Sequence, residues 1–148
     1  MVVSRRTNSP EATQFFGAEI AGRLKPGDVV GLFGELGSGK TCLVQGVCKA
    51  LGVEGRVTSP SFVMINEYAG HLRSTEILVY HFDLYRLKSP SELHELGYEE
   101  YFYGEGVCLV EWAERAGGFL PKEALRVNLG YVSESERELV FSDGTDDD

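Results

Sequence analysis

Hydrophobic residues recur at helical spacing in two stretches near the start of the chain. The first stretch begins at Ser9-Pro10, a favourable N-cap followed by a favourable first helical residue, and its apolar positions continue to about Leu24. The second runs over 40–51 and stops at Gly52. A continuous apolar run at 29–33 lies between them and predicts a buried strand over 28–33.

Extended patterns dominate the rest of the chain. Residues 62–69 and 77–87 read as strands, and the turn at Gly70-His71 predicts that 62–69 pairs with 77–84 as a hairpin. The remaining predicted elements are a helix from Ser89-Pro90-Ser91-Glu92 to Leu96-Gly97, a short buried strand at 106–112, and strands near 124–131 and 137–142.

One predicted strand carries polar residues in line. In 79–87, period-two alternation places His81, Asp83 and Tyr85 on one face of the strand. A histidine, a carboxylate and a phenol on one face make this strand a candidate for chemistry. The opposite face carries Tyr80, Phe82 and Leu84.

Length and composition indicate a single globular domain over residues 1–148. The chain is 43% hydrophobic and 25% charged, with no internal repeat, linker or low-complexity segment. No apolar stretch approaches a membrane span and no secretion signal is visible, so we expect a cytoplasmic protein without a membrane partner. Cys42, Cys48 and Cys108 form no metal-ligating pattern and are expected to act as small hydrophobes in a reducing compartment.

The net charge restricts the partners. At −9, with a pI of about 4.8, the chain is poorly suited to hold nucleic acid by itself, because that affinity comes mainly from cations that neutralise phosphates. Any RNA substrate would have to be presented by a partner protein. Residues 142–148 are expected to form a disordered acidic tail.

The strongest chemical signal is a phosphate-binding P-loop between a predicted strand and a predicted helix. Its glycines allow successive backbone N–H groups to point at phosphate oxygens, Lys40 supplies a cation, and Thr41 offers a hydroxyl to Mg²⁺. The sequence therefore predicts nucleoside triphosphate binding by an α/β, P-loop NTPase-like sandwich with a mixed parallel and antiparallel central sheet. The matching residues are Gly34-Glu35-Leu36-Gly37-Ser38-Gly39-Lys40-Thr41.

A P-loop needs an acid at the end of a neighbouring strand to hold Mg²⁺, directly or through water. Glu111 ends the apolar run 107–110, and Asp83 lies in the strand with His81. His81 is interpreted either as a packed strand histidine, the commoner case, or as a general base. The sequence alone does not rank these residues.

The segment Thr58-Ser59-Pro60-Ser61 follows Thr41 by 17 residues. Many P-loop proteins place a mobile loop there that senses the γ-phosphate. Spacing alone leaves a plain connecting loop as an equal alternative.

These segments together resemble the bacterial TsaE family (formerly YjeE), the P-loop ATPases of tRNA threonylcarbamoyladenosine synthesis. The order and spacing agree from about Ser9 to Phe141. The resemblance rests on the P-loop, on Thr58-Ser59-Pro60-Ser61-Phe62, on Val79-Tyr80-His81-Phe82-Asp83-Leu84-Tyr85-Arg86-Leu87 and on Cys108-Leu109-Val110-Glu111-Trp112.

The resemblance implies ATP as the nucleotide and Mg²⁺ as the metal. It assigns catalysis to Lys40, Asp83 and Glu111, and metal binding to Thr41, Asp83 and Glu111. It also implies that Ser59 and Ser61 belong to a switch-like loop. The implied nucleotide-binding residues are Glu11, Gly34, Glu35, Leu36, Gly37, Ser38, Gly39, Lys40, Thr41, Cys42 and Arg137.

Three positions depart from the family's usual residues. Glu35 stands where Asp is usual and Ser61 where Thr is usual, and both keep the relevant chemistry. Cys42 stands where a second hydroxyl residue is common, which removes one side-chain hydrogen bond to phosphate and affects affinity more than activity.

The resemblance further implies an ATPase that acts on a complex of the TsaD and TsaB proteins and resets it between turnovers. The tRNA would be held by those partners. Two alternatives stay open: a small-molecule kinase, for which an arginine-rich lid is missing from the sequence, and a nucleotide-gated binding module with incidental hydrolysis.

Overall fold

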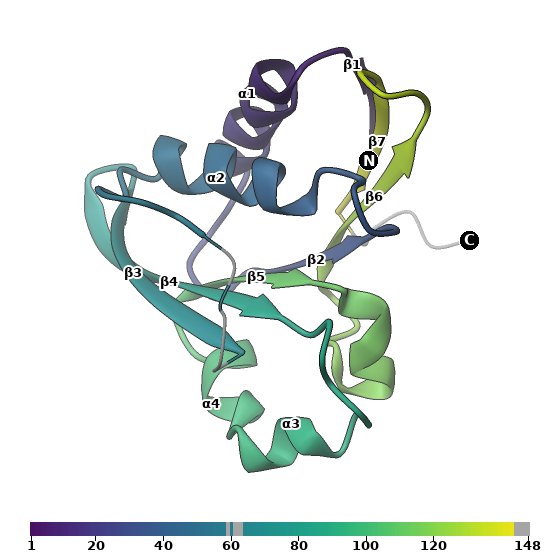
Figure 1. Ribbon diagram of the computed structural model, residues 1–148. Coiled ribbons are helices and arrows are strands. Elements are labelled where there is room, and N and C mark those ends of the chain that lie inside the picture. Colours follow the sequence, from purple (N-terminus) through teal and green to yellow (C-terminus); the bar gives the residue numbers. More distant parts are fainter. Residues whose placement is uncertain (59, 61–63, 144–148) are drawn as a thin grey trace.

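The computed structural model describes residues 1–58, 60 and 64–143. Within these residues, seven strands form one twisted sheet in the order β1-β7-β6-β2-β5-β4-β3 (Figure 1). The central pairs β6–β2, β2–β5 and β5–β4 are parallel, whereas β1–β7, β7–β6 and β4–β3 are antiparallel. The predicted mixed sheet is therefore confirmed. The strands are β1 (Val2–Thr7), β2 (Val29–Phe33), β3 (Ile65–Leu72), β4 (Thr75–Asp83), β5 (Val107–Glu111), β6 (Leu125–Tyr131) and β7 (Arg137–Ser142).

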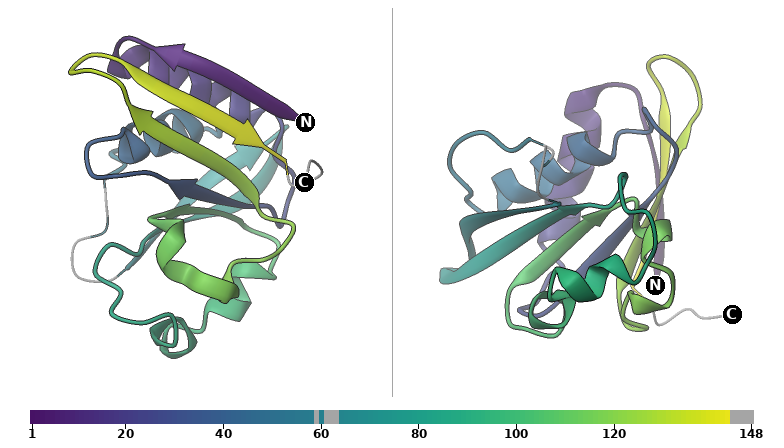
Figure 2. Two further views of the ribbon diagram at one scale, coloured as in Figure 1. Left: turned by 90° about the vertical axis from the view of Figure 1, so that its right-hand side faces the viewer. Right: turned by 60° about the horizontal axis from the view of Figure 1, so that its bottom comes forward.

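Helices cover both faces of the sheet, which completes the predicted α/β sandwich (Figures 1 and 2). The helices α1 (Pro10–Ala21) and α2 (Lys40–Ala50) lie on one face, called here the P-loop face. The helices α3 (Glu92–Glu95) and α4 (Tyr98–Phe102) and the 3₁₀ segment η1 (Ala113–Phe119) lie on the other, called the aromatic face. Across the described ranges, even the longest helix, α1 with 12 residues, lacks the length and apolar character needed to cross a bilayer.

Local sequence signals explain where α1 begins and how closely α1 and α2 pack. The hydroxyl of Ser9 accepts a hydrogen bond from the Ala12 backbone N–H at 3.0 Å, as expected of an N-cap. Gly46 on α2 faces α1 so closely that an added Cβ would lie 2.2 Å from the Gln14 carbonyl oxygen. This close crossing fixes α2, and with it the P-loop, over the centre of the sheet.

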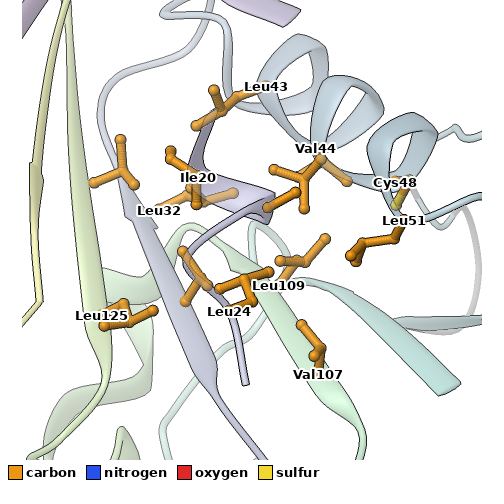
Figure 3. Packing of buried hydrophobic residues seen from close by; sticks show 14 of the residues in the cluster. Ile20, Leu24, Leu32, Leu43, Val44, Cys48, Leu51, Val107, Leu109 and Leu125 are labelled. Atoms are coloured by element: carbon orange, nitrogen blue, oxygen red, sulfur yellow. The ribbon is translucent and has the colours of Figure 1, made fainter. Parts of the chain in front are cut away.

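Two apolar clusters hold the layers together. The first joins α1 and α2 to the sheet through Ile20, Val44, Leu109 and their neighbours (Figure 3). The second lies on the aromatic face and includes Phe82 and Phe102. Each cluster contains side chains that are fully buried, so the strands between them are covered on both faces.

Alternate residues of β4 and β5 contribute to the two layers, as the period-two pattern predicts. In register, Val79 pairs with Val107, His81 with Leu109 and Asp83 with Glu111. The first two pairs include three members of the cluster on the P-loop face, whereas Phe82, Cys108 and Val110 belong to the cluster on the aromatic face. His81, Asp83 and Glu111 therefore lie on the face toward α2.

The structure corrects one predicted element in this region and adds another. The predicted strand 77–87 ends at Asp83, because the Asp83 carboxylate accepts the Tyr85 backbone N–H at 3.0 Å and turns the chain out of the sheet. The predicted helix that closes at Leu96-Gly97 corresponds to α3, and a second short helix, α4, which was not predicted, follows after Gly97 with its left-handed φ of 71°.

The edges of the sheet also differ from expectation. Strand β1 was not predicted, since its polar outer positions hide the alternation; Arg5 and Arg6 pair there with Glu19 and Glu138. Strand β7 extends through Ser142, the first residue of the predicted tail. The next residue, Asp143, accepts a hydrogen bond from the N-terminal ammonium of Met1 at 2.9 Å. Residues 62–63 of the predicted hairpin and 144–148 of the tail lie outside the described residues.

Candidate functional site: a P-loop facing two strand-end acids

The loop between β2 and α2 adopts the conformation that its glycines permit. Gly37 and Gly39 have φ angles of 81° and 102°, in the left-handed region that favours glycine. Gly34 packs so closely against β6 that an added Cβ would lie 2.5 Å from the Leu129 carbonyl oxygen. The loop therefore turns tightly into the first residues of α2, where the helix N-terminus favours anions.

The amine of Lys40 is held by its own loop. Its Nζ donates to the carbonyl oxygens of Gly34 at 2.6 Å and Glu35 at 2.9 Å, and to the Ser38 hydroxyl at 3.3 Å. The same Nζ lies 3.9 Å from the centre of the Trp112 ring. Burial lowers the pKa of Lys40, and the nearby carboxylates, Glu114 first, oppose that shift.

Thr41 connects the P-loop helix to the end of β5. Its hydroxyl donates to the two carboxylate oxygens of Glu111 at 2.9 and 3.1 Å. The Nε2 of His81 lies 2.5 Å from Oε2 of the same carboxylate. His81 and Glu111 are 0% and 2% exposed, so this polar cluster is buried in the layer under α2.

Asp83 lies beside Glu111 as its register partner on β4. Burial raises the pKa of Asp83, and Glu111 adds to that rise, while the Tyr85 N–H, His81 and Lys40 oppose it. Thr41, Asp83, Glu111 and Lys40 together line a cavity of about 360 Å³. Leu36, Gly37, Gly39, Cys42, Tyr85 and Trp112 complete its walls.

A second cavity of about 360 Å³ lies on the other side of the P-loop helix start. Gly39 and Cys42 line both cavities, so the two cavities adjoin each other at the start of α2. The second cavity is bounded by the start of α1, at Ser9 and Pro10, and by Arg137 at the start of β7.

Arg137 and Glu11 are placed differently from each other. The Nε of Arg137 donates to the Gly37 carbonyl oxygen at 3.0 Å, and its Nη1 donates to the Ser133 carbonyl oxygen at 2.6 Å. Arg137 thus connects the β6–β7 turn to the P-loop. Glu11 instead lines a hollow of about 420 Å³ along α1 and α2, with Phe15 and Lys49.

The remaining predicted site residues differ in burial, in hydrogen bonding and in whether the structure describes them. Ser38 is buried inside the loop, whereas Leu36 is 75% exposed at its tip. Cys42 donates to the Pro10 carbonyl oxygen at 3.2 Å, and its thiol pKa is raised by burial. Ser59 and Ser61 of the predicted switch-like loop lie outside the described residues.

The donor set at the first cavity fits Mg²⁺. A hydroxyl and two carboxylates are hard oxygen donors, and Mg²⁺ is commonly held by one or two carboxylates together with substrate phosphates rather than by an all-protein cage. Consistent with this, the described part of the chain contains no group of three or more His, Cys, Asp or Glu side chains arranged to hold a metal ion by themselves.

Sequence reasoning left two site residues unassigned. His81 contacts Glu111, and the signal for it was its position two residues before Asp83 on the same strand face. Trp112 covers the amine of Lys40 from a left-handed backbone with a φ of 58°, a conformation that no local sequence pattern indicates.

Known proteins resemble this chain over nearly its whole length. The family model of the threonylcarbamoyl adenosine biosynthesis protein TsaE matches residues 7–139. A tRNA threonylcarbamoyladenosine biosynthesis protein TsaE of Bacillus subtilis is 42% identical over 137 residues, which cover 93% of this chain and 83% of the relative. The TsaE protein of Treponema pallidum is 36% identical over 136 residues, covering 92% of this chain and 97% of the relative.

A solved structure agrees with these sequence relatives. The crystal structure of YdiB from Bacillus subtilis superposes with a TM-score of 0.79 at 38% identity, covering 95% of this chain and 84% of that one. The P-loop face described above therefore belongs to a fold that the relatives share. On the family model and on these identities, the chain belongs to the TsaE family of threonylcarbamoyl adenosine biosynthesis proteins.

Proposed function

We propose that this protein binds ATP with Mg²⁺ at the P-loop face and hydrolyses it in the synthesis of threonylcarbamoyladenosine on tRNA. The observation that carries the proposal is the bond from the Thr41 hydroxyl to the Glu111 carboxylate. It joins the first turn of the P-loop helix to a strand-end acid, the pair that P-loop ATPases use to hold Mg²⁺.

The first cavity supplies the groups that the phosphates of ATP require. The backbone N–H groups of the loop and the start of α2 would bind phosphate oxygens. Lys40 would exchange the carbonyl oxygens of Gly34 and Glu35 for the β- and γ-phosphates, which are better partners for an ammonium because they are charged. The second cavity, beyond Gly39 and Cys42, is where the nucleoside would extend.

Thr41, Glu111 and Asp83 would hold the metal, directly or through water. When bound, Mg²⁺ neutralises charge that develops on the phosphates. Asp83 lies at the same edge and is the acid that would orient the attacking water. Trp112 and Tyr85 line this cavity, and the Trp112 ring covers one side of the Lys40 amine.

The biological role follows from the relatives. The Bacillus subtilis and Treponema pallidum proteins are named for tRNA threonylcarbamoyladenosine biosynthesis. We place this chain in that synthesis as an ATPase that acts on a cytoplasmic complex of TsaB and TsaD and resets it between turnovers. The net charge of −9 supports a division of labour in which the partners hold the tRNA.

Phosphate release from ATP tests the proposal. It is measured for the chain alone, with TsaB and TsaD, and with the Glu111→Gln variant in both settings. We expect slow release by the chain alone, faster release with the partners, and loss of the stimulated rate in the variant. Release that TsaB and TsaD leave unchanged would contradict the partner-coupled role.

The same geometry supports a second candidate, a nucleotide-gated binding module. The loop satisfies Lys40 with its own carbonyl oxygens, and the phosphates of ATP would have to displace them. A switch of this kind requires that partner affinity differ between nucleotide states. ATP-dependent binding of TsaB–TsaD without stimulated phosphate release would favour this candidate.

A further inference from the structure

His81 occupies an unusual place in the layer between the sheet and α2. It is 0% exposed and lies on the same strand face as Val79, beside Leu109 on β5, and both of these neighbours are buried. A buried polar ring among apolar side chains costs free energy unless it is hydrogen-bonded. An apolar residue would fill this position at a lower cost in free energy. The presence of an imidazole here therefore indicates a role beyond packing.

The hydrogen bonds of His81 point to that reason. Its Nε2 contacts Oε2 of Glu111, and a carboxylate can only accept, so Nε2 is the donor. Within the described residues, the other ring nitrogen, Nδ1, is buried without a partner. The ring therefore leaves one nitrogen unsatisfied while it keeps the other on Glu111, which indicates that the contact with Glu111 determines how the ring is placed.

Among the described residues, Thr41 and His81 are the two side chains that donate to the Glu111 carboxylate, and they differ in whether they can turn to another partner. Thr41 lies at the start of α2, and the proposed function requires its hydroxyl to turn toward the metal. His81 belongs to β4, inside the sheet, and contacts Glu111 without lining the cavity. His81 is thus the donor that stays in place when Thr41 changes partner.

We propose that His81 is a positioning residue that orients the Glu111 carboxylate for Mg²⁺. The proposal rests on the proposed function and names a residue beyond the P-loop, Asp83 and Glu111. It acts through Glu111 and touches neither nucleotide nor metal. Partners that orient a metal-binding carboxylate typically contribute about 10- to 100-fold to metal affinity.

Nucleotide binding at varied Mg²⁺ concentration tests the proposal. Binding is followed by calorimetry and by the fluorescence of Trp112, the only tryptophan of the chain. We expect His81→Leu to raise the Mg²⁺ concentration for half-maximal binding by about 10- to 100-fold, with little change in binding of metal-free ATP. His81→Gln, whose amide nitrogen can reach Glu111, should restore most of the loss. His71→Leu, on the exposed side of β3, is the matched control.

A purely structural role predicts a different outcome. It would lower the thermal midpoint and weaken binding with and without Mg²⁺ alike, and the glutamine would not rescue the Mg²⁺ dependence. We instead expect the nucleotide-free His81→Leu chain to keep its midpoint within about 4 °C, because leucine fits the apolar surroundings. His81→Leu should also add nothing to the Mg²⁺ requirement of Glu111→Gln, since both act at one carboxylate.

Nuclear magnetic resonance of the ligand-free chain supplies a readout that needs no metal. We expect a protected proton on Nε2 of His81 whose shift changes in Glu111→Gln; an unprotonated Nε2 would overturn the proposal even if His81→Leu failed to fold. If nucleotide binding by the wild-type chain requires Mg²⁺ and His81→Leu does not raise the Mg²⁺ concentration for half-maximal binding, this inference alone would be overturned. Wild-type nucleotide binding independent of Mg²⁺ would overturn it together with the proposed function.

Discussion

Strands β4 and β5 supply alternate residues to two layers that differ in what fills them. On the aromatic face, Phe82 packs against Tyr101 and Phe102 with ring centroids 5.5 and 5.2 Å apart, and the layer is held by shape and apolar contact. On the P-loop face, the same strands place His81 and Glu111 in a buried hydrogen-bonded cluster with Thr41. The aromatic face is filled by apolar contacts, whereas the P-loop face combines its own apolar cluster with polar groups that can bind a charged ligand.

The comparison shows how a P-loop sandwich separates stability from chemistry over a few residues. Moving one residue along β4, from His81 to Phe82, moves from the candidate site to the aromatic layer. The parallel register of β4 and β5 brings Asp83 and Glu111 together at one edge, and α2 begins over that edge. Substitutions on the two faces should therefore have separable effects.

The largest effect is expected on the aromatic face. Phe82→Ala removes a fully buried ring and should lower the free energy of unfolding by about 3–5 kcal/mol, because a cavity remains among Tyr101 and Phe102. Urea denaturation measures the loss. Where the variant is still folded, its affinity for ATP with Mg²⁺ should match the wild type. A proportional loss of that affinity would show that the two faces are not separable.

The converse effect is expected at Glu111. Glu111→Gln keeps the shape and the contacts with Thr41 but removes the charge, so Mg²⁺-dependent ATP binding should weaken about 100-fold or more. The free energy of unfolding should change by less than about 1 kcal/mol. Calorimetry with and without Mg²⁺ and a parallel urea series check both statements. Undiminished Mg²⁺ dependence in this variant would remove Glu111 from the metal site.

A pH dependence is expected from Asp83. Burial raises the pKa of this carboxyl, and the protonated form cannot serve Mg²⁺, so ATP affinity should fall about tenfold per pH unit below the raised pKa. The unliganded fold should respond with the opposite sign. The stabilising contribution of the Asp83 proton is complete below the ordinary pKa and is lost as the pH rises through the raised one. Comparison with Asp83→Asn, in which both dependences should be flatter, isolates this group.

The smallest of these effects is expected at Arg137, outside both faces. Arg137→Ala removes the bond to the Gly37 carbonyl and frees the P-loop from the β6–β7 turn. ATP affinity should drop about fivefold, the equivalent of one hydrogen bond of roughly 1 kcal/mol. Equilibrium binding measures this drop in affinity. Arg126→Ala is the control for charge, because it also removes one positive charge, from a side chain that stacks on Phe33. An equal loss in the control would assign the effect to general changes in charge.

Sequence patterns predicted much of the P-loop face. The capped start of α1, the apolar strand β2 and the P-loop helix α2 are strong local signals, and the family relatives and the sheet agree with them. The alternation in β4 also placed Asp83 on the same face as His81, and the structure shows that this face lies toward α2.

What escaped prediction depends on a long-range contact in one case and on local features without a clear pattern in two others. The contact between His81 and Glu111 joins residues 30 positions apart, through a strand register that no local pattern specifies. The end of β4 at Asp83 depends on a side-chain bond to the Tyr85 backbone, which competes with continuation of the strand. Edge strand β1 has too few apolar positions to show its alternation, because Arg5 and Arg6 place a charged side chain on each of its faces, paired with Glu19 and Glu138.

The location of the metal on the P-loop face is tested most directly by paramagnetic broadening. Mn²⁺, which accepts the same oxygen ligands as Mg²⁺, is added to the labelled chain with a slowly hydrolysed ATP analogue. We predict that resonances of Thr41, Asp83 and Glu111 broaden first and only when nucleotide is present, while those of Phe102 on the aromatic face stay sharp. Broadening that begins away from Thr41 and Glu111, or that is the same without nucleotide, would contradict the account.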